Sequence, residues 1–269
     1  MKLTICGTRG SIPVFGKEYE KYGGSTSCYL IETDLMAIIV DAGTGILNVP
    51  RLNQQNIPIL ITHSHIDHLI GLTAYEGLKD AHRNIDIYLA KREGLSSKKQ
   101  IERLISNPLW PCKIDDYPAK VTIKELKVLG KGLEFGDIKV FSMEADHPGG
   151  STIYRFESGD KKIVLVTDHE HRDEKKTKEL SAFSKEADLI LYDAQYTSKE
   201  YEEHIGYGHS TPEAGIKLKE MSGAKKLVFI HYLPAHTDGF ITDQEESIRK
   251  QYRDCKDISF GYEGEVITL

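Results

Sequence analysis

The sequence predicts an α/β protein, because segments with the character of buried strands alternate with segments of helical length and polarity. The strand candidates are residues 2–6, 36–40, 85–89, 136–143, 188–192 and 226–230. The helix candidates are residues 94–106, 175–185, 211–221 and 244–252. They fall into two similar sets, and each set has strands that end in carboxylates or histidines. Two sheets packed face to face with helices outside, or one doubly wound sheet, would give this alternation, so periodicity alone leaves the architecture open.

Length and composition bound the class of protein. A chain of 269 residues can bury a sizeable core, and α/β architectures of this length commonly form one domain, so we expect residues 1–269 to be a single domain. The hydrophobic share of 39% and the charged share of 28% are those of an ordinary soluble globular protein. The formal net charge is -6, whereas proteins that hold long nucleic acids usually present a basic face. A long nucleic acid is therefore disfavoured as a partner, although a local basic patch stays open.

Cysteine usage and the start of the chain indicate a cytoplasmic protein. The four cysteines are far apart and form no Cys-x-x-Cys pair, and the first residues lack the apolar core of a signal peptide. We therefore expect reduced thiols. No apolar run approaches the roughly 20 residues of a membrane helix, so we expect no membrane partner. Homodimer formation stays open.

The beginning of the chain predicts a strand followed by a small loop. Residues 2–6 lead into Gly7-Thr8-Arg9-Gly10-Ser11-Ile12-Pro13, and glycines at these positions would let the backbone approach a ligand. An ordinary turn accounts for the same composition equally well. The strand at residues 36–40 ends in Asp41, which suits either a turn cap or a carboxylate that supports a ligating histidine.

A cluster of histidines and one aspartate follows the next apolar run. The stretch is Ile59-Leu60-Ile61-Thr62-His63-Ser64-His65-Ile66-Asp67-His68. Imidazole and carboxylate groups suit zinc, iron or manganese, and four of them this close can serve two adjacent metals. The apolar residues from Leu69 to Leu78 then predict an amphipathic helix. A solvated surface cluster would need neither neighbour, so we favour a metal site.

Further along the chain, isolated polar residues again follow strands. A strand at 136–143 precedes His147, a hairpin formed by 151–156 and 162–167 ends at Asp168, and the strand at 226–230 ends at His231. Residues 107–120, which lie between the histidine cluster and the strand at 136–143, are rich in proline and aromatic residues. They suit a loop over a pocket, and Trp110 either pins that loop to the core or belongs to a lid that covers the substrate.

The pattern His-x-His-x-Asp-His at residues 63–68 resembles the signature loop of the metallo-β-lactamase-fold hydrolases, which also carry later isolated ligands. The resemblance implies a four-layer αβ/βα sandwich with a dinuclear metal site. It assigns His63, His65 and His147 to one metal and Asp67, His68 and His231 to the other, with Asp168 as the bridge. It also implies that Asp41 supports a ligating histidine and that Asp67 takes part in catalysis. Zinc is the first choice of metal, and manganese or iron would also be accepted.

The stretch Gly206-Tyr207-Gly208-His209-Ser210-Thr211 resembles the Gly-His-Ser-Thr element of the phosphodiesterase branch of this fold, which includes ribonuclease Z and the phosphoribosyl cyclic-phosphate phosphodiesterases. The resemblance implies that two divalent metals polarise a phosphoryl oxygen and supply a bridging hydroxide. His209 would then protonate the leaving group as general acid. Ser210, Thr211 and the start of the following helix would bind phosphate oxygens through their N–H groups, and Arg9 would reach the site from the opening loop.

These residues favour a dinuclear-metal phosphodiesterase that acts on a small phosphodiester, cyclic ones included. A ribonuclease Z-like endonuclease is the first alternative, but the long glycine- and proline-rich arm expected of one is absent from the sequence. The members most like the phosphoribosyl cyclic-phosphate phosphodiesterases carry a structural zinc loop near the start of the chain. This sequence lacks that loop, which leaves the substrate open. Lactamase or thioesterase chemistry would not require His209, and the diiron oxygen-reducing proteins carry glutamate where His65 stands. A non-catalytic metal sensor, with iron as one option, stays open because ligands alone do not prove turnover.

Overall fold

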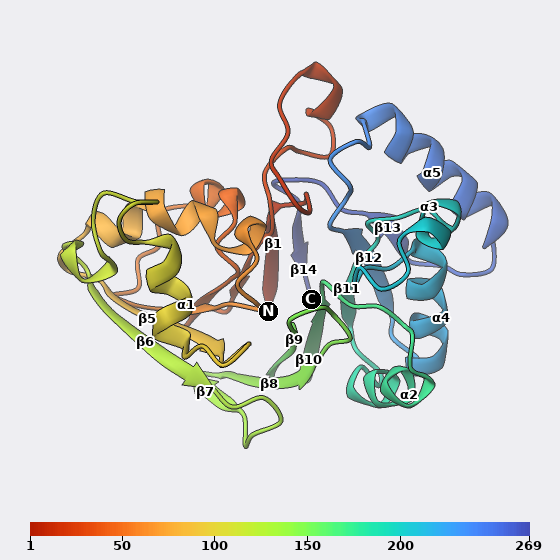
Figure 1. Cartoon of the computed structure of the whole chain (residues 1–269). Helices are drawn as coiled ribbons and strands as arrows, with labels where there is room; N and C mark the ends of the chain where they lie inside the picture. Colours follow the sequence, from red (N-terminus) through yellow and green to blue (C-terminus); the bar gives the residue numbers. More distant parts are fainter.

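The computed structural model describes residues 1–269, which form two seven-stranded sheets (Figure 1). The first sheet has the order β14-β1-β2-β3-β4-β5-β6. Its strands are β1 (Lys2–Gly7), β2 (Cys28–Glu32), β3 (Ala37–Val40), β4 (Asn56–Leu60), β5 (Asn84–Ala90), β6 (Lys120–Leu126) and β14 (Val266–Thr268). The second sheet has the order β13-β12-β11-β10-β9-β8-β7. Its strands are β7 (Leu133–Phe135), β8 (Ile138–Glu144), β9 (Thr152–Ser158), β10 (Lys161–Val166), β11 (Leu189–Asp193), β12 (Lys226–Ile230) and β13 (Ile258–Phe260).

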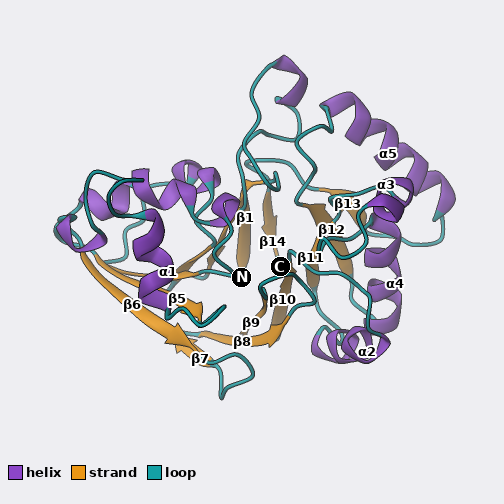
Figure 2. Ribbon diagram, viewed as in Figure 1, coloured by secondary structure: helices purple, strands orange, loops and turns teal.

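Three apolar clusters show how the layers are arranged. One cluster contains inward-facing residues of both sheets, such as Leu60 from β4 and Leu165 from β10, and therefore fills the space between them. A second lies under the helical segments that cover the first sheet, and a third lies under the helices that cover the second. Figure 2 shows these helical layers on opposite sides of the paired sheets. The predicted four-layer αβ/βα sandwich is confirmed.

Parallel pairing brings several strand ends to one edge of each sheet. Strands β3, β4, β5 and β6 run parallel in the first sheet, and β10, β11, β12 and β13 run parallel in the second. Carboxyl ends of parallel strands meet at the same edge, where ligand sites in α/β proteins usually form. Most of the residues singled out in the sequence follow these ends.

The helices of the structure are α1 (Ser97–Leu104), α2 (Glu174–Phe183), α3 (Ser198–Glu203), α4 (Pro212–Ser222) and α5 (Asp238–Gln251). Four of them coincide with predicted helices, although α5 begins well before residue 244 because Thr237 caps its start. The short helix α3 was not predicted. None of the helices is both long and apolar enough to cross a membrane.

The amphipathic helix predicted after His68 is wrong. The chain instead forms short 3₁₀ helices at Ile66–His68, Ile70–Ala74 and Glu76–Lys79. The buried apolar residues of this segment are Leu69, Leu72, Tyr75 and Leu78. Their spacing is three residues, which matches the 3.0-residue turn of a 3₁₀ helix better than the 3.6-residue turn of an α-helix.

Two hydrogen bonds join the sheets directly before the ligand loop. The Tyr154 hydroxyl of β9 donates to the carbonyl of Ile61 at 2.8 Å, and the Thr152 amide donates to the carbonyl of Thr62 at 3.0 Å. Tyr154 is fully buried. These bonds fix the position of His63, the next residue along the chain, relative to the second sheet.

Tyr154→Phe should lower the free energy of unfolding by about 1–3 kcal/mol, because it leaves a buried carbonyl without its side-chain donor. Urea titrations of the two proteins would measure the difference. Tyr262→Phe is the matched control, since that tyrosine is 48% exposed and makes no side-chain hydrogen bond. Equal stabilities of the two variants would show that the intersheet bond contributes nothing.

Candidate metal centre

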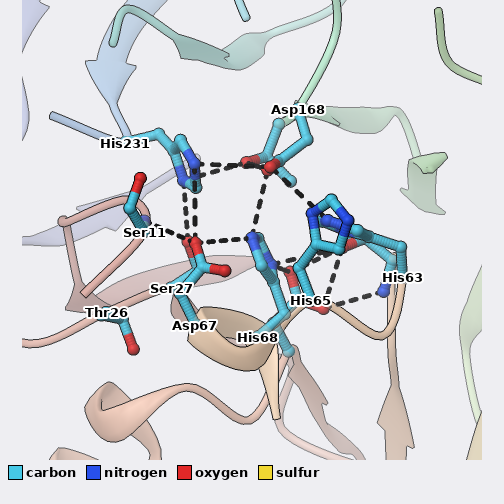
Figure 3. A network of polar contacts seen from close by, with 12 residues as sticks. Ser11, Thr26, Ser27, His63, His65, Asp67, His68, Asp168 and His231 are labelled. Carbon is cyan, nitrogen blue, oxygen red and sulfur yellow. Dashed lines mark hydrogen bonds and ion pairs between the residues drawn. The ribbon is translucent and has the colours of Figure 1, made fainter. Parts of the chain in front are cut away.

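Seven candidate ligands converge in one place. Figure 3 labels His63, His65, Asp67, His68, Asp168 and His231 among them. The seven candidates form one group of His63, His65, His147 and Asp168, and a second group of Asp67, His68, Asp168 and His231. Within each group the candidate ligand atoms lie within 4.8 Å of one another. Asp168 belongs to both groups, so the structure brings together all of the residues that the sequence suggested as ligands.

Three of the histidines place an Nε2 atom at this centre that lacks a hydrogen-bond partner. The Nε2 atoms of His63, His68 and His231 are buried and make no hydrogen bond. They lie near carboxylate oxygens instead: His68 Nε2 is 3.2 Å from Asp168 Oδ1, and His231 Nε2 is 3.4 Å from Asp168 Oδ2. Unpaired buried polar atoms are costly, so their convergence fits cations that would complete them. Nitrogen and oxygen donors of this kind are suited to divalent metals.

The opposite ring nitrogens are held by a second set of groups. His68 Nδ1 donates to Asp41 Oδ2 at 2.8 Å, and Asp41 itself accepts the Thr62 amide at 2.8 Å. His231 Nδ1 lies 3.0 Å from Ser27 Oγ. Such contacts fix the tautomer and the ring orientation that a metal ligand needs. The structure thus places Asp41 behind a histidine, outside both ligand groups.

The backbone is strained at several of these positions. Asp41, Asp168 and His231 have φ angles of 59°, 52° and 66°, in the left-handed region that residues with a side chain rarely adopt. Each follows the end of a strand, β3, β10 and β12 respectively. Strained residues of this kind cluster at functional sites, where the surrounding structure compensates their cost.

The charges around the centre favour cations. Burial and the neighbouring imidazoles lower the pKa of His63 well below its ordinary value, which keeps this ring neutral and able to bind metal. Burial also lowers the pKa of His68, but the three carboxylates around it outweigh burial and raise that pKa well above its ordinary value. The same attraction, exerted by His231 and other imidazoles, outweighs burial and lowers the pKa of Asp168. Positive charge is therefore stabilised where the metals would lie.

His209 lies against the two ligand groups without belonging to either. Its ring stacks on His231 at a centroid distance of 5.2 Å and meets the His147 ring edge-on at 5.3 Å. Its Nδ1 donates to Asp193 Oδ2 at 2.8 Å, and the Asp193 side chain is fully buried. Burial lowers the pKa of His209, but nearby carboxylates, Asp193 foremost, outweigh burial and raise it to about 9. Nε2 is therefore the nitrogen left to exchange a proton with a ligand.

Asp193 was missed as a site residue. The sequence showed only an aspartate that ends an apolar strand, β11, and gave no link to a histidine sixteen residues later. The recurrence of a carboxylate at a strand end, as at Asp41 and Asp168, was the available signal. Because β11 lies between β10 and β12, its carboxyl end necessarily falls beside Asp168 and His231.

The opening loop reaches the centre through its backbone, and the prediction that Arg9 would reach it is wrong. The amide of Ser11 donates to Asp67 Oδ2 at 2.7 Å, and a side chain at Gly10 would fall 2.6 Å from His231 Nε2. Arg9 is fully buried and donates to the carbonyls of Gly23 and His236 at 2.7 Å and 2.6 Å. Its guanidinium therefore ties loops together and is not available to a substrate.

The phosphate contacts expected of Ser210 and Thr211 through their N–H groups stay a prediction, but their hydroxyls are already in use. Ser210 is 3% exposed, and its hydroxyl lies 2.7 Å from that of Tyr192. Thr211 caps α4, because its hydroxyl accepts the Ala214 amide. Both hydroxyls serve the local structure, which leaves the N–H groups of this segment as the predicted phosphate contacts.

Trp110 is tied to the body of the protein. Its ring nitrogen donates to the Tyr117 hydroxyl at 2.9 Å, and that hydroxyl donates to the carbonyl of Thr73 at 2.7 Å. The neighbouring Leu109 is 69% exposed and lines a 230 Å³ pocket together with Ser64 and Ile66 of the ligand loop. The tryptophan thus pins the loop, while its neighbour borders the approach to the ligand loop.

Comparisons with known proteins agree with this geometry. The family model described as the beta-lactamase superfamily domain matches residues 37–232, which contain all of the candidate ligands. The exodeoxyribonuclease WalJ of Streptococcus pneumoniae is 29% identical over 154 residues, which cover 54% of this chain and 51% of that protein. The chain therefore spans about half the length of this relative.

Two further proteins match over most of their length. Ribonuclease Z of Archaeoglobus fulgidus is 21% identical over an alignment of 282 positions, gaps included, that covers 86% of each protein. The crystal structure of the metallo-β-lactamase-fold protein YhfI of Bacillus subtilis superposes with a TM-score of 0.75 at 16% identity, over 99% of this chain and 98% of that one. The matched family model, the paired sheets and the convergent histidines and aspartates together place the chain in the beta-lactamase superfamily, among the hydrolases of the metallo-β-lactamase fold.

Proposed function

We propose that the protein is a dinuclear-metal phosphodiesterase. The observation that carries the proposal is His209, which lies against the two ligand groups, belongs to neither and is backed by Asp193. Hydrolysis of a phosphodiester expels an alkoxide, which needs a proton. A histidine beside the metals, separate from their ligands, meets that need, whereas a sensor would not require it.

Each side chain of the centre has a part in this chemistry. Bound at the two ligand groups, divalent metals would supply Lewis-acid polarisation of the phosphoryl oxygens and activation of water at neutral pH. Asp67 and Asp168 contribute the negative charge that holds the cations, and the Ser11 amide fixes one oxygen of Asp67. His209 delivers a proton to the leaving oxygen from Nε2 while Asp193 holds its Nδ1 proton. We favour zinc, with manganese and iron as alternatives.

The proposed substrate is a small phosphodiester, cyclic ones included. The net charge of -6 argues against strong attraction of a long polyanion, and the burial of Arg9 removes one cation from the approach. The second candidate is a nuclease, which is favoured by the relatives named exodeoxyribonuclease and ribonuclease Z. The proposal includes a cytoplasmic setting, in which the four free cysteines stay reduced.

The first prediction from this proposal concerns metal content. Wild-type protein should bind two metals per chain, and Asp168→Ala should reduce that number because it removes the residue shared by both groups. Elemental analysis after dialysis against zinc would measure it. Asp160→Ala, at an exposed hairpin position, is the matched control and should keep both metals. A wild-type protein that never exceeds one metal per chain would exclude the dinuclear centre.

The second prediction concerns the class of reaction. The metal-loaded protein should hydrolyse bis-p-nitrophenyl phosphate faster than it opens a β-lactam or cleaves a thioester. Cyclic phosphodiesters and short single-stranded DNA and RNA, assayed side by side, would separate the small-substrate proposal from the nuclease candidate. If no phosphodiester is turned over while both metals are bound, the sensor alternative replaces the enzyme.

The third prediction separates proton delivery from metal binding. His209→Ala should keep its metals but lose a factor of about 10²–10⁴ in rate on substrates with poor alkoxide leaving groups, the usual contribution of a general acid. The loss should be small for nitrophenolate, which leaves without a proton. Rates across a series of leaving groups would test this, with metal content measured in parallel. An equal loss across the series would contradict the general-acid role.

A further inference from the structure

The carboxylate of Glu170 lies directly behind the loop that carries His209. Its side chain is fully buried, yet it does not contact the metal centre. Oε1 accepts the Gly206 amide and the Tyr201 hydroxyl, each at 2.8 Å, and Oε2 accepts the Gly208 amide at 2.9 Å. Arg172 Nε lies 3.4 Å from Oε2. A buried carboxylate with this many donors is well compensated, so the loop backbone is arranged around one charge.

Gly208 links this carboxylate to the site. Its amide points to Glu170, and its carbonyl lies 3.0 Å from Nδ1 of His147, a candidate metal ligand. Its φ is 86°, and a Cβ atom at this position would fall 2.1 Å from His147 Nδ1, so only glycine fits here. The next residue is His209. Gly208 therefore connects Glu170 with both histidines. Its carbonyl contacts His147, and the chain continues from it directly into His209.

The backbone of Glu170 joins the same elements. Its amide donates to the carbonyl of Asp146 at 2.9 Å, directly before His147, and Glu170 follows Asp168 by two residues. Arg172 reinforces this connection, because its Nη2 lies 2.6 Å from Asp146 Oδ1. Three segments that bear site residues are thus joined at Glu170, through its backbone as well as its side chain.

We propose that Glu170 is a positioning residue that fixes the orientation of His147 and His209 relative to each other. The proposal rests on the phosphodiesterase function and deepens it. Without the carboxylate, the half-buried amide of Gly206 and the buried amide of Gly208 lose their acceptor. Gly206 and Gly208, at φ angles of 94° and 86°, then have many other conformations open to them. The loop would relax, and the proton donor and the metal ligand would lose their alignment together.

Glu170→Gln tests this in the metal-loaded protein, because the amide keeps the shape but loses the charge and one acceptor oxygen. On a substrate with a poor leaving group, kcat should fall by about 10–100-fold with little change in KM, and the apparent zinc affinity measured against a chelator should weaken by about tenfold. Asp188→Asn is the matched control. This 9% exposed aspartate accepts the Lys162 amide at 2.8 Å, near the start of β11 and away from the site. It should leave both quantities unchanged.

A double-mutant cycle identifies the route of the effect. In the His209→Ala background, Glu170→Gln should lower kcat by less than about threefold, because residues that act as a unit are not additive. An equal fold-loss in both backgrounds, together with unchanged zinc affinity, would overturn the proposal and leave Glu170 with a role in folding only. Tyr201→Phe, which removes one donor and keeps the carboxylate, should reduce kcat by about threefold. It serves as the test if Glu170→Gln does not fold.

Hydrogen exchange separates this proposal from the phosphodiesterase function. In Glu170→Gln the amides of Gly206 and Gly208 should exchange at least about tenfold faster, and in Asp188→Asn they should not. If no phosphodiester is hydrolysed by the wild-type protein, faster exchange combined with weaker zinc affinity still supports positioning of His147. Unchanged exchange combined with unchanged zinc affinity overturns it, whatever the activity.

Discussion

Charge compensation in a buried space is the constraint on which the rest of the structure depends. Asp67, Asp168 and three histidine nitrogens are held within a few ångströms of one another and are almost entirely withdrawn from water. An arrangement of this kind is expensive unless positive charge lies among the ligands. The ligands cannot separate to relieve the cost, because they follow strands whose pairing is fixed. Metal binding and folding of this edge are therefore coupled.

The convergence of the candidate ligands could be predicted from the sequence because their chemistry is carried by residue type. Four histidine and aspartate residues within six positions, directly after an apolar run, strongly favour metal ligation, and parallel strands bring later ligands to the same edge. The layer order followed from the same pattern only with help from the family resemblance. The 3₁₀ segment was mispredicted because apolar residues three apart fit both helix types in part, and only close packing of the following turns decides between them.

The residues that orient other side chains of the site were much harder to predict from the sequence. Arg9 stands in a glycine loop and looks like a substrate contact, yet it is enclosed by backbone carbonyls that no local pattern reveals. The hydroxyls of Ser210 and Thr211 look available to a ligand, but they serve in a buried hydroxyl pair and a helix cap. Asp193 and Glu170 act through contacts 16 to 38 residues away in the chain. Spacing within a motif carries no information about such partners.

The topology explains why the proposed proton donor and the candidate metal ligands can be different residues that lie side by side. Strands β10, β11 and β12 are parallel neighbours, and Asp168, Asp193 and His231 occupy their carboxyl ends in that order. The middle position holds Asp193, whose carboxylate accepts the Nδ1 proton of His209, so His209 is held beside the candidate ligands Asp168 and His231. Its loop is irregular and glycine-rich, which lets the backbone pass close to His147 but gives it little rigidity of its own. Rigidity must then come from outside the loop, and a buried carboxylate that accepts backbone amides is one of the few groups able to supply it without occupying the space of the substrate.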